Sequence, residues 1–215
     1  MPPALPYASP SELSLDADRI ALAQRLFSEW ANGNAPAFPG GALVVGRRGK
    51  MLEPHFVGRM GPEPDAEPIR RDAIFLLASI TKPLVYTTAL QLVERGELSL
   101  TDRVTDFFPE FGVNGKERTL VFHLLTHTSG LPDMPLNNVE LRRSHAPLSK
   151  FVEAAINSPL LYPPGTNHRY QSMGTLMTAA IGERIVGRPI HEILREEVFE
   201  PLAMNSSRLG SADLD

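Results

Sequence analysis

One proline, Pro83, fixes where the central helix of this chain can begin. It lies in the stretch AIFLLASITKPLVYTTALQLVERG, residues 73–96, whose apolar residues follow helical spacing from Leu84 onward. Inside a helix a proline loses a hydrogen bond and clashes with the carbonyl four residues before it, at a cost of about 3 kcal/mol. The helix is therefore predicted to begin just before Pro83 and to end at Gly96, a residue type typical of helix ends. The apolar run 74–78 in front of it is expected to be a short buried element.

Ser79 and Lys82 fall at the start of this helix, three residues apart and hence on one face. Backbone N–H groups at a helix start are unpaired and favour a developing negative charge. Lys82 also lies on the stripe that is expected to be buried, and a desolvated amine beside a hydroxyl is one way to make a serine nucleophilic. A plainer interpretation is that Ser79 only caps the helix and that Lys82 lies along the surface. The Ser-x-x-Lys spacing alone does not decide between the two.

The composition narrows the class of protein and its partners. The chain has 215 residues, 42% of them hydrophobic, which is enough for a sizeable core. Its net charge of −4 gives no basic surface for nucleic acid or an anionic membrane, and the absence of cysteine excludes disulfides and thiolate metal sites. No apolar run approaches the roughly 18 residues of a membrane span, and the start MPPALPYASP lacks the features of an export signal, so a cytoplasmic protein is expected. No phosphate-binding loop or dinucleotide fingerprint occurs, and no cofactor is expected.

In front of the central helix the sequence predicts an arm, a helix and a hairpin. Residues 1–15 hold four prolines and no periodicity, which predicts a flexible N-terminal arm. Residues 16–30 carry apolar side chains at helical spacing. Residues 40–45 and 51–57 are typical of two strands joined by a tight Arg-Gly turn.

Shorter helices are expected after the central helix, at 121–125, 149–156, 173–185 and 189–194. Thr119 and Ser149 are expected to cap the first two of them. His123 and His127 lie four residues apart and could share a metal ion, but a third ligand is not evident, so histidines bonded within a helix and a turn are favoured and no metal site is predicted. The hairpin and the helices together predict an α+β fold.

Four sequence segments follow one another in the chain: FLLASITK at 75–82, LLTHTSGL at 124–131, PPGTNHRYQS at 163–172 and EPLAMNSSRL at 200–209. Together they resemble the serine β-lactamase-like superfamily, especially its branch of class C β-lactamases, family VIII-type esterases and DD-peptidases. The resemblance implies a β-lactamase/transpeptidase-like fold, with a helical region and part of an antiparallel sheet. Residues 16–215 would then be the N-terminal portion of a single domain.

The resemblance also implies a set of site residues. Ser79 resembles the acylated nucleophile, Lys82 its amine partner and Tyr170 the tyrosine of the second motif. A tyrosinate held by a nearby ammonium could accept the serine proton and later activate water. The class C pattern is Tyr-x-Asn, whereas here Ser172 stands in the place of the asparagine and is expected to contact the substrate. This departure favours esters over β-lactams.

The expected function is that of a serine hydrolase that forms an acyl-Ser79 intermediate on a small carboxylic ester or β-lactam. The family's third motif, Lys or His, then Ser or Thr, then Gly on a strand, is expected after residue 215, so the C-terminal strands would be absent. The sequence His-Thr-Ser-Gly at 127–130 belongs to an earlier turn. The alternative is a catalytically incomplete remnant or binding module with the first two motifs only. An exposed sheet edge would then favour a homo-oligomer.

Overall fold

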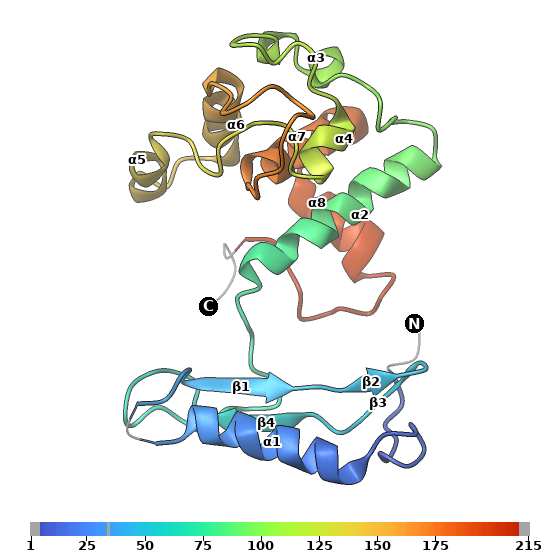
Figure 1. The fold of residues 1–215 in the computed structure, drawn as a ribbon, viewed down its shortest axis with the longest axis vertical. Helices are drawn as coiled ribbons and strands as arrows, with labels where there is room; N and C mark the ends of the chain where they lie inside the picture. The colour runs from blue at the N-terminus through green and yellow to red at the C-terminus, as the bar shows by residue number, and fades with distance from the viewer. Residues whose placement is uncertain (1–4, 34, 211–215) are drawn as a thin grey trace. The chain divides into compact units, whose positions relative to one another are not determined.

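The computed structural model describes residues 5–33 and 35–210, which form two compact units (Figure 1). The chain divides between Leu76 and Leu77, and the parts before and after this point are called the N-terminal unit and the helical unit. Helices together with short antiparallel strands make this the predicted α+β fold. The expectation that residues 16–215 belong to a single domain stays a prediction.

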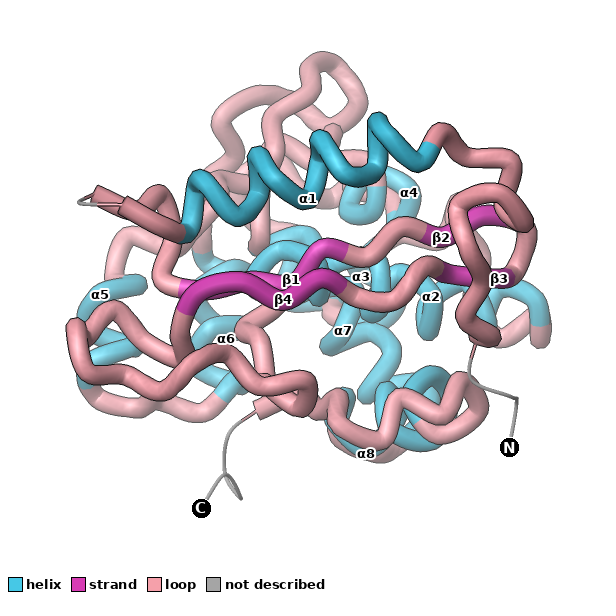
Figure 2. The backbone as a smooth tube through the Cα atoms, turned by 90° about the horizontal axis from the view of Figure 1, so that it is seen from below, coloured by secondary structure: helices cyan, strands magenta, loops and turns pink. Residues whose placement is uncertain are grey.

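The N-terminal unit consists of one helix packed on antiparallel strands. Helix α1, Ala17–Ala31, lies along strands β1, Gly40–Leu43, and β4, His55–Gly58, which pair with each other (Figure 2). The carboxylate of Asp16 accepts hydrogen bonds from two backbone N–H groups of the first helical turn, at 2.9 and 3.1 Å, as an N-cap does. The helix predicted at 16–30 is thus confirmed, with Asp16 as its cap.

The two predicted strands are also confirmed, as one long hairpin that is interrupted in the middle. Beyond β1 and β4, strands β2, Gly46–Arg47, and β3, Lys50–Met51, pair at the hairpin's end. The turn residues Arg48 and Gly49 have φ angles of 53° and 73°, the left-handed pair that a two-residue hairpin turn requires. Within the described residues each sheet has two strands, and the expected oligomer through an open edge stays a prediction.

The described part of the predicted flexible arm contacts the hairpin. The N–H of Met51 donates to the carbonyl of Pro6 at 3.0 Å, and the N–H of Ala8 donates to the carbonyl of Met51 at 2.9 Å. Leu13 is only 1% exposed. These backbone bonds and this burial tie residues 6–13 to the sheet, whereas residues 1–4 lie outside the described part of the chain.

The helical unit is built around two long helices, α2 and α7. Its elements in chain order are η1 Ala78–Ile80, α2 Thr81–Glu94, α3 Val104–Phe107, η2 Pro109–Phe111, α4 Val121–Leu125, α5 Asn138–Arg143, α6 Leu148–Asn157, α7 Met173–Val186, α8 Ile190–Leu194 and η3 Arg195–Phe199.

The core of this unit forms where α2, α4 and α6 pack on α7. Met173 and Met177 on α7 are 2% and 0% exposed, which confirms that these methionines belong to the core. Val85 and Ala89 of α2 are buried as the helical spacing predicts. Since α7 is covered along most of its length, it provides a fixed support for the residues that precede it.

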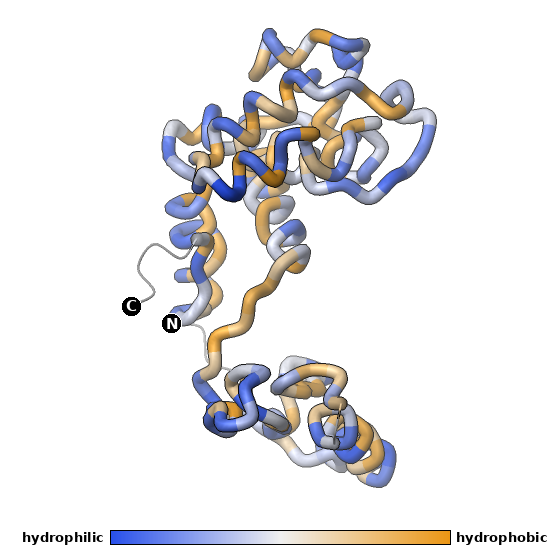
Figure 3. The backbone as a smooth tube through the Cα atoms, turned by 90° about the vertical axis from the view of Figure 1, so that its left-hand side faces the viewer, coloured by the Kyte–Doolittle hydropathy of each residue, from blue (hydrophilic) through white to orange (hydrophobic). Residues whose placement is uncertain are grey.

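Three local predictions are wrong. The run 74–78 is not a buried element: residues 74–77 have no regular secondary structure, Ile74 is 59% exposed and Leu76 is 95% exposed, and the division between the two units falls within this run, which Figure 3 colours as hydrophobic. Thr119 does not cap α4, since the preceding residue is Leu120, whose N–H is accepted by the Nδ1 of His123 at 3.1 Å. Helix α6 begins at Leu148 after a proline, so Ser149 lies inside it.

Among the helices of the described residues, none combines the length and the apolar character that a membrane span requires.

Candidate active site

Ser79 lies in the short turn η1, directly before α2. Pro83 is the third residue of α2, where its missing N–H costs no helical hydrogen bond, so the predicted start of the helix is confirmed. Ser79 is solvent-exposed, and the residue before it, Ala78, has a φ of 46°. Left-handed backbone at a residue with a Cβ costs about 1–2 kcal/mol and is found preferentially at functional sites. The chain therefore presents the Ser79 hydroxyl on a constrained turn at a helix start.

Lys82 is on the buried side of α2, as predicted, and is 9% exposed. Its Nζ donates to the Oγ of Ser79 at 3.1 Å and to the Oγ of Ser172 at 3.2 Å. The first bond follows from the three-residue spacing on one helix, whereas the second joins residues that are far apart in the sequence. One ammonium group thus connects the two predicted motifs.

Tyr170 lies beside the same ammonium group. Its ring centroid is 4.7 Å from the Nζ of Lys82, and the residue is 49% exposed. Hydrogen bonding with Lys82, and next with Ser79, lowers the pKa of the Tyr170 phenol; the charge of Lys82 lowers it further, while desolvation and Asp133 oppose the shift. The structure thus brings all four predicted site residues, Ser79, Lys82, Tyr170 and Ser172, into one cluster within the helical unit.

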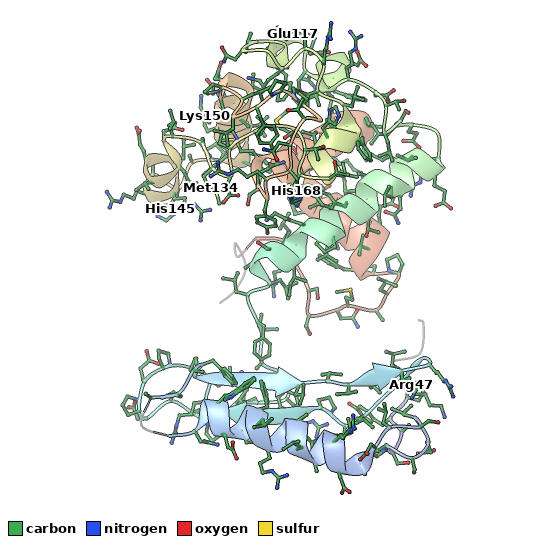
Figure 4. The ribbon with its side chains drawn as sticks, viewed as in Figure 1. Arg47, Glu117, Met134, His145, Lys150 and His168 are labelled. Atoms are coloured by element: carbon green, nitrogen blue, oxygen red, sulfur yellow. The ribbon has the colours of Figure 1, made fainter. Side chains whose placement is uncertain are left out.

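The segment that carries Tyr170 has no regular secondary structure, and it is held by the turn that follows α4. Arg169 N–H donates to the carbonyl of His127 at 3.0 Å, and Ser172 N–H donates to the carboxylate of Asp133 at 2.7 Å. Figure 4 labels His168 in the same segment. Two turns from separate parts of the sequence are therefore bonded to each other on both sides of Tyr170.

Gln171 adds a third attachment that the sequence did not reveal. It is 0% exposed; its amide donates to the Oγ of Ser129 at 3.3 Å, and its carbonyl oxygen accepts the N–H of Gly174 at the start of α7. Because its neighbours Tyr170 and Ser172 point to the cluster, the middle residue of the Tyr-x-Ser motif is turned into the protein. Asp133 was missed as well, although its place at the end of the THTSGLPD turn was a possible signal.

His123 and His127 are the two histidines that the sequence left open as ligands of a shared metal ion. His123 uses its Nδ1 to accept the Leu120 N–H, and the described residues contain no group of three or more His, Asp or Glu side chains that could hold a metal ion.

Beside Lys82 and Ser172 the surface has a hollow of about 190 Å³, lined in part by Leu176 and Ile190. The cluster thus combines hydroxyl, ammonium and phenol groups, with a hollow next to it.

Comparison with known proteins identifies a family and relatives of this chain. The family model described as Beta-lactamase matches residues 28–215. The chain is 32% identical to esterase EstB of Burkholderia gladioli, over 95% of this chain and 55% of the relative. It is 30% identical to an N-acetylmuramyl-L-alanine amidase of Bacillus subtilis, over 79% and 42% of the two chains. The chain thus spans about half the length of these relatives.

Solved structures show the same fold. EstCE1, described as a hydrolase with promiscuous acyltransferase activity, superposes with a TM-score of 0.73 at 24% identity, over 86% of this chain and 52% of that one. The D-amino acid amidase of Ochrobactrum anthropi has a TM-score of 0.74 at 22% identity, over 86% and 50%. The fold is therefore β-lactamase/transpeptidase-like, and with the family match and the esterase relative the chain belongs to the Beta-lactamase family.

Proposed function

We propose that this protein is a serine hydrolase that forms an acyl-Ser79 intermediate, acting on carboxylic esters and with lower preference on β-lactams. The observation that carries the proposal is the convergence on Ser79 of two groups that could activate it. The Lys82 ammonium is 3.1 Å from its hydroxyl oxygen, and hydrogen bonding with Lys82 and Ser79 lowers the pKa of Tyr170. A serine nucleophile needs such a base, because its hydroxyl is weakly nucleophilic by itself.

In the acylation step, the Tyr170 phenolate accepts the proton of the Ser79 hydroxyl as the serine Oγ attacks the carbonyl carbon of the substrate. The carbonyl oxygen becomes an oxyanion beside the N–H groups at the start of the helix, which favour negative charge. When the tetrahedral intermediate collapses, the bond from the carbonyl carbon to the leaving oxygen or lactam nitrogen breaks. The proton held by Tyr170 passes to that leaving atom, and the acyl group stays on Ser79.

In the second step water releases the acyl group. Tyr170, again a phenolate, takes a proton from water, the hydroxide attacks the acyl carbon, and the proton is returned to Ser79 as the ester bond breaks. Lys82 stabilises the phenolate in both steps through its positive charge.

A preference for esters is supported by Ser172. Its hydroxyl accepts a bond from Lys82 at 3.2 Å, so it could help to orient the ammonium, but it lacks the amide N–H₂ that an asparagine would offer to an amide side chain of a β-lactam. The relative that is 32% identical is named an esterase, which agrees with this preference.

Covalent labelling tests the proposal directly. A fluorophosphonate probe, followed by mass spectrometry of the digested protein, is expected to add to the peptide that contains Ser79, and Ser79→Ala should abolish the adduct. Ser149→Ala is the matched control, because Ser149 is also exposed and lies in the first turn of a helix in the same unit, and it should label like the wild type. A folded protein without a Ser79 adduct would refute the proposal and favour the alternative of a non-catalytic module.

A further inference from the structure

His127 has a backbone conformation that its residue type seldom adopts. It follows α4 in the THTSGLPD turn and has a φ of 59°, in the left-handed region that disfavours residues with a Cβ. Strained conformations of this kind persist where the surrounding structure requires them, and they gather at functional sites. His127 therefore lies in a constrained turn.

The ring of His127 packs on the ring of Tyr170. The two centroids are 4.8 Å apart with an interplanar angle of 45°, closer than the distances from His127 to Tyr86, 6.4 Å, and to His168, 6.1 Å. The backbone of His127 reaches the same segment, since its carbonyl accepts the Arg169 N–H at 3.0 Å. His127 thus contacts Tyr170 through its side chain and the preceding residue, Arg169, through its main chain.

The pKa of the His127 imidazole lies below its ordinary value. Burial lowers the pKa of its imidazole, and the charges of His168 and Lys82 lower it further, while the backbone of Gln171 and Asp133 raise it by less. Its Nδ1 is buried and makes no hydrogen bond within the described part of the chain. Burial thus disfavours a second cation next to Lys82, and the contact between the two rings restricts the phenol by packing.

We propose that His127 is a positioning residue for Tyr170: the imidazole ring of His127 packs on the phenol and keeps its hydroxyl directed at Ser79 and Lys82. The inference rests on the proposed function, because it assigns a role to a neighbour of the proposed base. Tyr170 needs such support because half of it faces solvent and its segment lacks regular structure. Orientation of this kind matters for rate, since a displacement of about 1 Å at a reacting group can cost roughly a hundredfold.

The kinetic test compares His127→Leu with His127→Phe, which share the backbone strain and differ in the aromatic ring. His127→Leu should lower the rate of acylation by p-nitrophenyl butyrate roughly ten- to a hundredfold and move the acidic limb of its pH profile to higher pH, whereas His127→Phe should stay within about threefold of wild type. In the Tyr170→Phe background the leucine variant should cause little further loss, because the group it positions is gone. Full additivity would overturn the inference.

Direct titration of the phenol provides a test that needs no turnover. The near-ultraviolet absorbance difference between each protein and its Tyr170→Phe counterpart reports ionisation of Tyr170 alone. The midpoint should move to higher pH in His127→Leu and stay at the wild-type position in His127→Phe. His123→Leu is the matched control, since His123 also lies in this part of the fold and its imidazole bonds to Leu120.

The outcomes of these experiments separate the positioning role of His127 from the proposed hydrolase function. An unchanged midpoint in His127→Leu would refute the positioning role even if Ser79 is acylated. A folded wild-type protein without a Ser79 adduct would refute the proposed function and leave the titration result valid, and a Tyr170→Phe enzyme of normal activity would refute Tyr170 as its base. If the leucine variant does not fold, His127→Asn replaces it, because asparagine tolerates the left-handed conformation and lacks the ring. Its phenol midpoint is then expected to move to higher pH, and an unchanged midpoint overturns the inference.

Discussion

The two buried lysines of the helical unit should respond in opposite ways to replacement by methionine, which keeps the volume and removes the charge. Lys82 is 9% exposed and bonds to the hydroxyls of Ser79 and Ser172, whereas Lys116 is 0% exposed and donates to the carbonyl of Ser158 at 2.7 Å. Lys82→Met is expected to remove activity without loss of stability. Lys116→Met is expected to remove stability without loss of activity.

The magnitude for Lys82 follows from two opposing contributions. Two hydrogen bonds from a charged donor contribute about 1.5–3 kcal/mol each, but holding an ammonium away from water costs several kcal/mol. The serine partners retain access to water after the change, because Ser79 is exposed and Ser172 is half-buried. The free energy of unfolding of Lys82→Met should therefore stay within about 1 kcal/mol of wild type or rise. Its acylation rate should fall about a hundred- to ten-thousandfold, since the phenolate loses its cation.

Lys116→Met leaves the carbonyl of Ser158 without its donor in a buried place, and Ser158 is only 7% exposed. An unsatisfied buried acceptor costs about 1–3 kcal/mol, which is the expected loss in the free energy of unfolding. Urea denaturation followed by circular dichroism measures stability, and burst kinetics with p-nitrophenyl butyrate measure acylation. A Lys82→Met protein destabilised by more than about 2 kcal/mol, or one that is still acylated at the wild-type rate, would refute the assignment of Lys82 to the site.

Three further results are expected. Tyr170→Phe should slow acylation roughly a hundred- to ten-thousandfold. In the wild type the acylation rate should rise with pH and level off below the ordinary tyrosine pKa of about 10, because the pKa of Tyr170 is lowered. If Tyr170→Phe leaves this pH profile unchanged, Tyr170 is not the base. Ala78→Gly should relieve left-handed strain and leave the free energy of unfolding equal to wild type or up to about 1 kcal/mol higher, as urea denaturation would show; a clear loss would mean that the Ala78 methyl packs. Burial lowers the pKa values of His123 and His127 in the folded protein, so below the unfolded histidine pKa of about 6.5 the unfolded chain binds more protons than the folded one. The free energy of unfolding should therefore fall as the pH drops from about 6.5 through the lowered pKa values of the folded protein. This fall should be less steep in His123→Leu.

Patterns within one helix predicted the first half of the candidate site. The proline at position 83 and the three-residue spacing placed Ser79 and Lys82 on one face at a helix start, and the structure has them in hydrogen-bond contact. Helical spacing is a local property, so the face that two residues share on a helix does not depend on how the rest of the chain folds. The same reasoning failed for residues 74–78, because a short apolar run without periodicity does not show by itself whether it forms a buried element.

The second half of the site could not come from local patterns. Tyr170 lies in a segment without regular structure, and only the resemblance of its motif to a known family pointed to it. Its attachment through His127, Gln171 and Asp133 depends on how two turns meet in space. Hydrogen bonds between residues far apart in the chain leave no spacing pattern in the sequence, so these attachments could be identified only from the structure, although the place of Asp133 at the end of its turn was a possible signal.

The position of Ser172 allows the substrate preference to be tested by a single substitution. Its backbone N–H is held by Asp133 at 2.7 Å, so the side chain can be exchanged without breaking that attachment. In Ser172→Asn the new carbonyl oxygen can still accept a bond from Lys82, and the N–H₂ group adds a donor that an amide-bearing β-lactam can use. A hydrogen bond of this kind is worth about 0.5–1.5 kcal/mol, so the ratio of acylation rates for benzylpenicillin over p-nitrophenyl butyrate should rise by roughly three- to tenfold. Ser172→Ala is the control, because it lacks both the acceptor for Lys82 and the added donor. If the ratio is the same in the asparagine and alanine variants, residue 172 does not contact the substrate, and the preference for esters must have another cause.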